Sequence, residues 1–262
     1  MATLNLPLEA LYGVLLIFIR VAAILFSTPI LDSGTIPFTF KVSLALAVSV
    51  LLLPLVDTTV SAGDLSLMAW LIGVISEIAI GLTIGLSIHL LFAGIQLAGQ
   101  VVGYQMGFAV ANVVDPATSD QIPILAQFYN LFAMLVFLAI NAHHLFFWAL
   151  VDSYRILPPL SMHISPELVG LLMKLAGDMF VVAVKVGAPL IAVMLVVSVG
   201  LGLVARTVPQ MHIFIVAMPL KILICLMVML VVTPYLTAYL IDLFGAYRGT
   251  LLDLLRLMAV AR

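Results

Sequence analysis

Five ionisable side chains lie inside apolar stretches, and they are the first candidates for chemistry: Arg20, Glu77, Asp178, Lys185 and Lys221. A charge at bilayer depth costs roughly 2.5–3.5 kcal/mol on insertion scales, and it needs a partner or water. A proton relay would usually offer more mid-stretch carboxylates than Glu77 and Asp178. We therefore expect these groups to be paired, and an ion pathway remains the alternative.

One helical stretch carries three charges at short intervals. Lys174, Asp178 and Lys185 are separated by four and seven residues, so one helix face presents plus, minus and plus. The pattern predicts a polar face that is paired either with itself or with another subunit.

Enzyme motifs are absent from the sequence: it has no phosphate-binding loop, no His-Glu-x-x-His and no Gly-x-Ser-x-Gly. Asp152 and Arg155 have the three-residue spacing of a helix-end ion pair. His143 and His144 are expected on different helix faces, and neither has a partner at the spacing of a helical metal site. We predict a protein that is not an enzyme and that has no metal site and no cofactor.

The composition places the chain in a membrane. Of its 262 residues, 65% are hydrophobic and 8% are charged, whereas soluble domains are about 25% charged. The net charge of −2 comes without a basic stripe, so nucleic acid is an unsuitable partner. The single cysteine, Cys225, is expected to be a small buried apolar residue. The first ten residues contain Glu9 but no Lys or Arg, so we expect the first apolar stretch to be a retained helix.

The apolar stretches are too uneven for a set of uniform spans. They run over residues 8–31, 42–56, 65–111, 124–151, 168–205 and 211–241. A spanning helix needs about 20 residues, whereas 65–111 would reach roughly 70 Å as one helix. Pro189, Pro219 and Pro234 lie inside such stretches and predict kinks. The fold class is therefore all-α, a membrane protein of long kinked helices and helical hairpins.

Small residues form a ridge along the third stretch. Glu77, Gly81, Gly85 and His89 follow one another at a spacing of four residues, so they share one helix face. Gly99, Gly103 and Gly107 extend the ridge farther along the stretch. Such spacing lets helix backbones approach closely in lipid. The ridge packs either inside the chain or against neighbouring subunits, and the two possibilities are compatible.

A small, apolar segment with a turn at Asp115-Pro116 begins within the last residues of the third stretch. It comprises Gly107, Phe108, Ala109, Val110, Ala111, Asn112, Val113, Val114, Asp115 and Pro116. Irregular backbone is tolerated at membrane depth only where it lines a cavity or is buried in protein. The segment is either a surface loop or a pliable plug in a pore.

A corner between two long apolar stretches is the most specific motif. It is formed by Arg206, Thr207, Val208, Pro209 and Gln210. With residues 218–221 (Met-Pro-Leu-Lys), the Val114-Asp115-Pro116 loop and residues 141–158, it resembles the FliR/SctT family of type III export gates. The resemblance covers nearly the whole chain. His212 departs from the flagellar pattern, which often has Asn there.

This resemblance implies a non-enzymatic component of the flagellar protein export gate in the bacterial inner membrane and flagellar basal body. The implied partners are FliP-like, FliQ-like and FlhB-like subunits, and the cargo is unfolded flagellar proteins. Residues 1–165 would resemble a FliP subunit and residues 166–262 a FliQ hairpin, stacked into a helical assembly. The segment from Gly107 to Ile122 matches the family's plug, and the corner matches a hairpin tip that faces FlhB. An ion-coupled small-molecule transporter, using Glu77, Asp178 and Lys185, is the alternative function.

Overall fold

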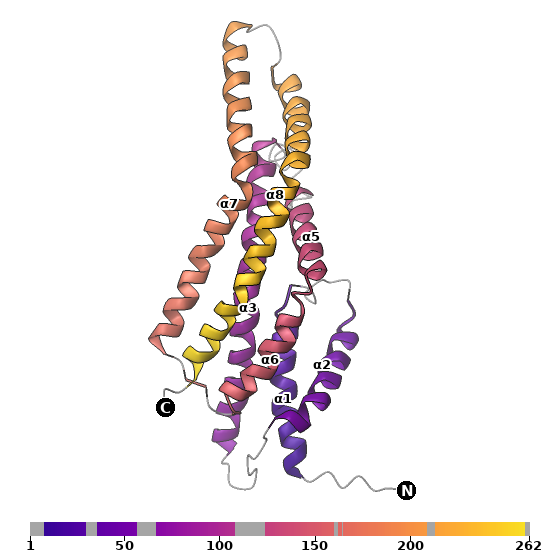
Figure 1. Ribbon diagram of the computed structural model, residues 1–262, viewed down its shortest axis with the longest axis vertical. Helices are drawn as coiled ribbons and strands as arrows, with labels where there is room; N and C mark the ends of the chain where they lie inside the picture. The colour runs from indigo at the N-terminus through magenta and orange to yellow at the C-terminus, as the bar shows by residue number, and fades with distance from the viewer. Residues whose placement is uncertain are drawn as a thin grey trace. The chain divides into compact units, whose positions relative to one another are not determined.

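The computed structural model describes residues 8–29, 36–56, 67–107, 124–159, 162–163, 165–208 and 213–259, and nearly all of them are helical. The helices are α1 (Leu8–Phe26), α2 (Phe38–Leu52), the short 3-10 helix η1 (Leu53–Leu55), α3 (Leu67–Gln105), α5 (Ile124–Ala139), α6 (His144–Ile156), α7 (Pro166–Thr207) and α8 (Ile213–Met258) (Figure 1). Within the described residues, the only β-type pairing is an isolated bridge between Met162 and Ala259. The all-α prediction is confirmed.

Three helices are far longer than a bilayer requires. Helices α3, α7 and α8 contain 39, 42 and 46 residues, which correspond to roughly 60–70 Å at 1.5 Å per residue. By length and composition, each could cross a membrane. Pro189 lies inside α7, and Pro219 and Pro234 lie inside α8. The expected long helices are therefore present, with prolines inside two of them.

The composition of the apolar stretch 124–151 suggests one helix, but the structure contains two. Helices α5 and α6 meet at a break where the direction changes by 69°. Asn141, in the turn between them, has a positive φ of 56°, a conformation that Asn adopts more readily than most residues. Counted as one broken span, the pair would raise the number of candidate spans from three to four.

The same turn overturns the expectation for the two adjacent histidines. Their rings lie together, with centroids 4.4 Å apart, instead of on different helix faces. His143 precedes the first residue of α6 and belongs to the turn. His143 nevertheless has helical backbone angles (φ −59°, ψ −24°), so the rings of these neighbours meet through the orientation of their side chains.

The chain divides into two compact units, which are described separately. The first contains Met1–Leu90, Asn141–Leu175 and Ala246–Arg262, and the second contains Leu91–Ile140 and Ala176–Gly245. In the first unit, α1 contacts both α2 and α6. Side chains of α1 and α3 make up much of its core, including Ile17, Ile24, Ile80, Ile84 and Ile88.

The second unit has its own apolar core. Phe92, Phe137 and Phe244 meet with ring centroids 5.0–5.7 Å apart. A further cluster joins buried side chains of α3, α5, α7 and α8 with a residue just beyond α3: Val102, Met106, Leu125, Leu190, Met194 and Cys225. Cys225 is thus a buried apolar residue, as predicted.

Gly99 shows how closely helices approach inside the second unit. A Cβ at this position would lie 2.6 Å from the Cα of Ala126 and 2.7 Å from the carbonyl oxygen of Leu125. Both atoms belong to the backbone, so a side chain can be accommodated only if α3 and α5 move apart. The ridge glycine therefore packs inside the chain.

We predict that Gly99→Ala destabilises the chain by about 1–3 kcal/mol, the usual cost of overpacking. Gly200→Ala is the matched control, because nothing lies within 4 Å of a Cβ there and Ala favours a helix by about 1 kcal/mol over Gly. The measurement is the thermal unfolding midpoint of each purified variant in detergent. Equal midpoints for the two variants would contradict the close packing of α3 on α5.

Candidate functional site

A fully buried ion pair joins α1 to α3 in the first unit. Arg20 Nε donates to one carboxylate oxygen of Glu77, and Nη2 donates to the other over 3.0 Å. Both side chains have no exposed surface. A two-pronged guanidinium–carboxylate contact is among the strongest hydrogen-bonded ion pairs in proteins. The sequence placed both charges in apolar stretches, and the structure makes them partners.

Two further donors of Arg20 bind α6 and the residue that follows it. Nη1 donates to Ser153 Oγ over 3.2 Å and to the carbonyl oxygen of Leu157 over 3.1 Å. The guanidinium carbon also lies 4.1 Å from the centre of the Tyr154 ring, a cation–π contact. Tyr154 in turn donates its hydroxyl to the carbonyl oxygen of Ile17. One arginine therefore ties three helices together.

The sequence alone did not identify the contributions of Ser153, Tyr154 and Leu157. Ser153 lies 133 residues from Arg20, and Leu157 contributes a backbone carbonyl. Helical spacing relates only residues a few positions apart, so it cannot reveal such partners. The available signal was the presence of Ser and Tyr in a mainly apolar helix, which marks polar atoms that need partners when buried.

Two glycines let α1 approach α3 beside the ion pair. A Cβ on Gly81 would come within 3.0 Å of the Arg20 carbonyl oxygen and 3.1 Å of the Ile24 nitrogen. A Cβ on Gly85 would overlap Ser27. The first part of the ridge therefore packs inside the chain, which is one of the two predicted possibilities.

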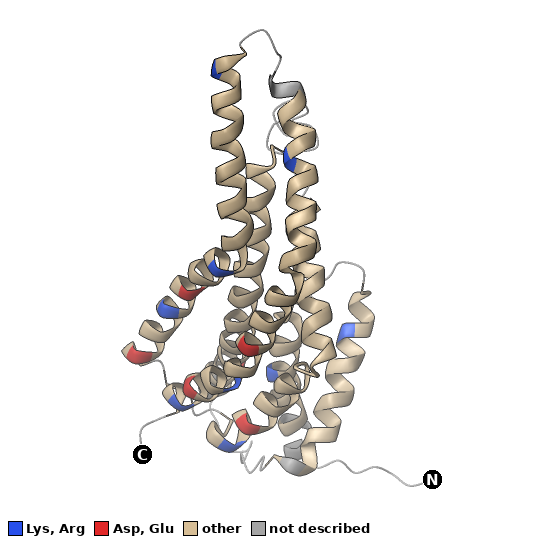
Figure 2. Ribbon diagram, turned by 45° about the horizontal axis from the view of Figure 1, so that its top comes forward, with Lys and Arg blue, Asp and Glu red and all other residues tan. Residues whose placement is uncertain are grey.

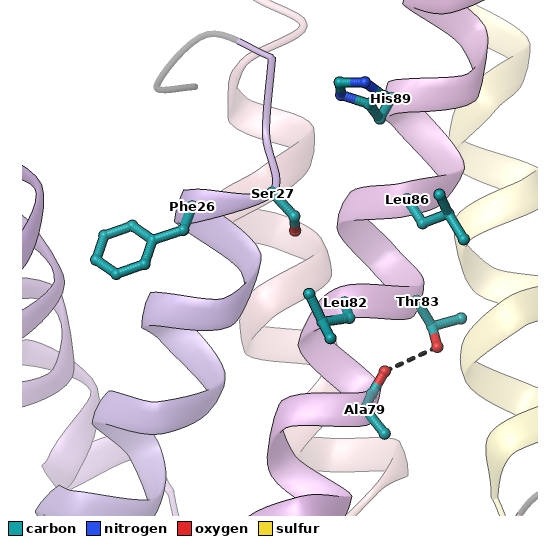
Figure 3. A pocket seen from close by; sticks show the side chains of 7 residues that line it. All are labelled: Phe26, Ser27, Ala79, Leu82, Thr83, Leu86 and His89. Atoms are coloured by element: carbon teal, nitrogen blue, oxygen red, sulfur yellow. Dashed lines mark hydrogen bonds between the residues drawn. The ribbon is translucent and has the colours of Figure 1, made fainter. Parts of the chain in front are cut away.

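Beyond this contact, α1 and α3 border a shallow groove with a volume of about 620 Å³ (Figure 3). The lining residues are Phe26, Ser27, Ala79, Leu82, Thr83, Leu86 and His89. The Thr83 hydroxyl donates to the carbonyl oxygen of Ala79 over 2.8 Å in its own helix. His89 is the only ionisable residue in this lining, and it is exposed. The groove is mainly apolar and contains no catalytic arrangement.

In the second unit, Lys221 of α8 lies next to the C-terminal end of α3. Its Nζ donates to the carbonyl oxygen of Gln105, the last residue of the helix, over 3.4 Å. Helix ends leave carbonyl oxygens without helical partners, and a cation is favourable there. Gly107 follows with a φ of 98°, a conformation typical of a glycine that terminates a helix. Lys221 thus has a polar partner, as a charge in an apolar stretch requires.

The predicted plug lies mostly outside the described residues. Only Gly107 is described, and residues Phe108 to Pro116 are not. A Cβ on Gly107 would lie 3.5 Å from Cε of Met218. The segment therefore begins next to α8, and its role remains a prediction.

The predicted corner is described through Val208. Arg206, Thr207 and Val208 are exposed at the end of α7, whereas Pro209, Gln210 and His212 lie outside the described residues. The Thr207 hydroxyl donates to the Val204 carbonyl over 3.0 Å, and Val208 N–H donates to the same oxygen over 3.0 Å. The Val204 carbonyl near the helix end therefore accepts two hydrogen bonds. The Arg206 side chain takes no part in them and is exposed.

The charges on α7 do not pair with one another in the described part of the chain. Lys174, Asp178 and Lys185 are all exposed, and the ion pairs found are Arg20–Glu77 and the predicted Asp152–Arg155, at 3.5 Å. Of the two predicted alternatives, pairing within the helix is not observed. Since Glu77 is bound by Arg20, the described residues give an ion pathway no support.

Metal binding has no candidate site in the described ranges. No group of three or more His, Cys, Asp or Glu side chains is placed there to hold an ion. The polar groups of the buried cluster bind one another, and this arrangement serves to join helices.

Three long apolar helices, one of which (α3) is tied to α1 by a buried ion pair, define an all-α membrane protein. Comparison with known sequences assigns its family. The chain belongs to the bacterial export proteins, family 1, whose profile matches residues 11–247. The resemblance to the FliR/SctT family is thereby confirmed.

The sequences of individual relatives align with most of this chain. The flagellar biosynthetic protein FliR of Bacillus subtilis (strain 168) is 29% identical over 98% of this chain and 100% of its own length. The protein of the same name from Escherichia coli (strain K12) is 29% identical over 90% of each chain. The FliR of Caulobacter vibrioides is 30% identical over 81% of this chain and 85% of its own.

We predict that Glu77→Leu costs about 3–5 kcal/mol of stability, because it leaves the Arg20 guanidinium buried without its carboxylate. The double variant Arg20→Met/Glu77→Leu should recover most of this loss, since both charges are removed together. The measurement is denaturant unfolding of the purified variants in detergent.

Arg155→Ala is the control for this pair. The Arg155 side chain is 76% exposed, and the loss of an exposed ion pair costs about 1 kcal/mol or less. If the double variant were no more stable than Glu77→Leu, the cost would not come from an unpaired buried charge.

Proposed function

We propose that this chain is a non-enzymatic component of the flagellar type III protein export gate, where it forms part of the channel that passes unfolded flagellar proteins across the inner membrane. The observation that carries the proposal is the family match, which covers residues 11–247. Relatives named flagellar biosynthetic protein FliR align with up to 98% of the chain. The proposed location is the flagellar basal body.

The proposed partners are FliP-like, FliQ-like and FlhB-like subunits. The apolar surface of α8 supports such an assembly: only 6% of its most apolar window is buried in the chain, and Val231 is 80% exposed. Such a surface requires lipid or protein cover. In this proposal, residues 1–165 take the place of a FliP subunit and residues 166–262 that of a FliQ hairpin.

The channel needs a closure, and we assign it to the segment from Gly107 to Pro116. The support is its composition, which combines small and apolar residues with a turn between two helices. Lys221 and Met218 lie at the start of this segment, next to Gln105 and Gly107. They would hold its first residue in place.

Shortening the segment by removing residues 108–113 should open a leak. We expect higher small-ion permeability of the membrane, together with altered secretion of flagellar proteins into the medium. The measurements are ion influx into cells with the complete export apparatus and the amount of flagellin outside them. Gly202→Ala, at an open position of α7, is the control. If influx and secretion both stayed at the wild-type level, the plug assignment would be wrong.

The exposed cation of Arg206 is the proposed contact with the FlhB-like subunit. Arginine is enriched among the residues that dominate binding, and a loss of 1.4 kcal/mol lowers affinity tenfold. Arg206→Ala should therefore reduce copurification of the FlhB-like subunit by about tenfold. Arg256→Ala, another exposed arginine near the end of α8, should leave it unchanged. Undiminished recovery with Arg206→Ala would exclude this corner as the docking site.

A further inference from the structure

The last turns of α8 are packed differently from its middle, where Leu230 and Val231 are exposed. Five side chains near the end recur every three or four residues, so they share one helix face, and all five are buried: Tyr247, Leu251, Leu254, Leu255 and Met258. Arg248, Asp253 and Arg256 of the same turns are exposed, and Figure 2 shows both signs of charge on the ribbon just before the C-terminus. This end of α8 is therefore amphipathic, and its apolar face is covered.

Two contacts tie this end of α8 to other helices of the first unit. Tyr247 and Ser87 of α3 share a buried hydrogen bond between their hydroxyl groups. The guanidinium carbon of Arg248 lies 4.0 Å from the centre of the Trp148 ring in α6, which is a cation–π contact. The same stretch of α8 therefore contacts both α3 and α6.

The segment before α7 supplies donors to the end of α8. A helix leaves its last carbonyl oxygens without helical partners. Here the Ser165 hydroxyl donates to the Leu257 carbonyl over 3.1 Å, and His163 N–H donates to the Met258 carbonyl over 3.0 Å. The Ser165 oxygen also accepts the Leu168 N–H over 3.1 Å, as the residue before a helix commonly does. One serine therefore joins the start of α7 to the end of α8.

These contacts unite parts of the chain that are far apart in sequence. The first unit consists of Met1–Leu90, Asn141–Leu175 and Ala246–Arg262, so its third part follows all the others along the chain. Ser87 and Tyr247 are 160 residues apart. The first part of α8 belongs to the second unit, so one continuous helix contributes to both.

We propose that residues 246–259 form a C-terminal clasp, a segment that closes the first unit and opens with it as one local unit, separately from the second unit. The buried face of the clasp supplies apolar contacts, and the hydrogen bonds at Ser87, His163 and Ser165 fix its position. Folded proteins commonly open in such contiguous units. The first unit then reaches its closed form only after the chain has been extended through residue 259. The clasp belongs to the chain itself and does not depend on the proposed function.

The test compares the accessibility of two buried positions in the full-length chain. Cys225, the single cysteine, is replaced by Ala, and one reporter is introduced at a time. The reporters are Ala149→Cys in α6 of the first unit and Ala133→Cys in α5 of the second, and both alanines are fully buried. The rate at which a maleimide alkylates each cysteine in detergent measures how often its surroundings open.

The clasp is weakened by Leu254→Ala/Leu255→Ala, which truncates two fully buried side chains. We expect alkylation at position 149 to become about tenfold faster or more, and alkylation at position 133 to stay unchanged. The matched control is Leu230→Ala/Val231→Ala, which truncates two exposed side chains of the same helix and should change neither rate. Tyr247→Phe is the milder variant: it removes only the hydroxyl that bonds to Ser87, and it should accelerate alkylation at position 149 alone.

A covalent lock distinguishes opening of the clasp from general damage. Met162 and Ala259 form an antiparallel bridge, and residues paired in this way are close enough for a disulfide. Met162→Cys/Ala259→Cys is added to the weakened variant, and alkylation at position 149 is followed by mass spectrometry of the peptides. Oxidation should restore slow alkylation, and reduction should reverse the effect.

Three results would overturn the proposal. Unchanged alkylation at position 149 in the weakened variants would show that the clasp does not close the first unit. Equal acceleration at positions 149 and 133 would show that the whole chain opens together. A lock that forms but leaves alkylation at position 149 fast would place the opening elsewhere in the first unit.

Discussion

The contact between the Arg20 guanidinium and the Glu77 carboxylate is the constraint on which the first unit depends. Neither group is tolerated alone in an apolar interior, and together they remove each other's cost only if every remaining donor is also satisfied. Ser153 and the carbonyl of Leu157 accept from Nη1, so that four of the five guanidinium N–H groups have an acceptor. The result is a junction of α1, α3 and α6 in which every nitrogen of the Arg20 guanidinium has a hydrogen-bond partner, and apolar packing alone would not specify it as narrowly.

The glycines of α3 belong to the same device. Gly81 lies one turn after Glu77, and it meets α1 at the backbone of Arg20 and Ile24. A larger residue there would move α1 away and lengthen the contact between guanidinium and carboxylate. Close helix approach and charge pairing therefore stabilise each other, so that a change at either one affects both.

Much of the fold was predictable because apolar helices have a strong periodic and compositional signal. The long helices, the need for a partner at Arg20 and Glu77, and the burial of Cys225 all followed from it. The identity of that partner did not, since Arg20 and Glu77 are 57 residues apart and spacing relates only near neighbours on a helix. The break between α5 and α6 was missed because a turn at Asn141 changes the backbone without interrupting the apolar composition. The plug and most of the corner tip lie outside the described residues, so their roles stay predictions.

In this account, the two charges of the Arg20–Glu77 contact are paired inside the first unit, whereas Lys174, Asp178 and Lys185 on α7 are exposed. The internal contact ties α1 to α3. The most direct test of the internal part is an experimental structure of the chain within its native assembly, at a resolution that shows side chains. The account predicts that the Arg20 guanidinium contacts both oxygens of Glu77 together with Ser153 and the Leu157 carbonyl. An Arg20 side chain that instead points to lipid, to the channel or to another subunit would contradict it.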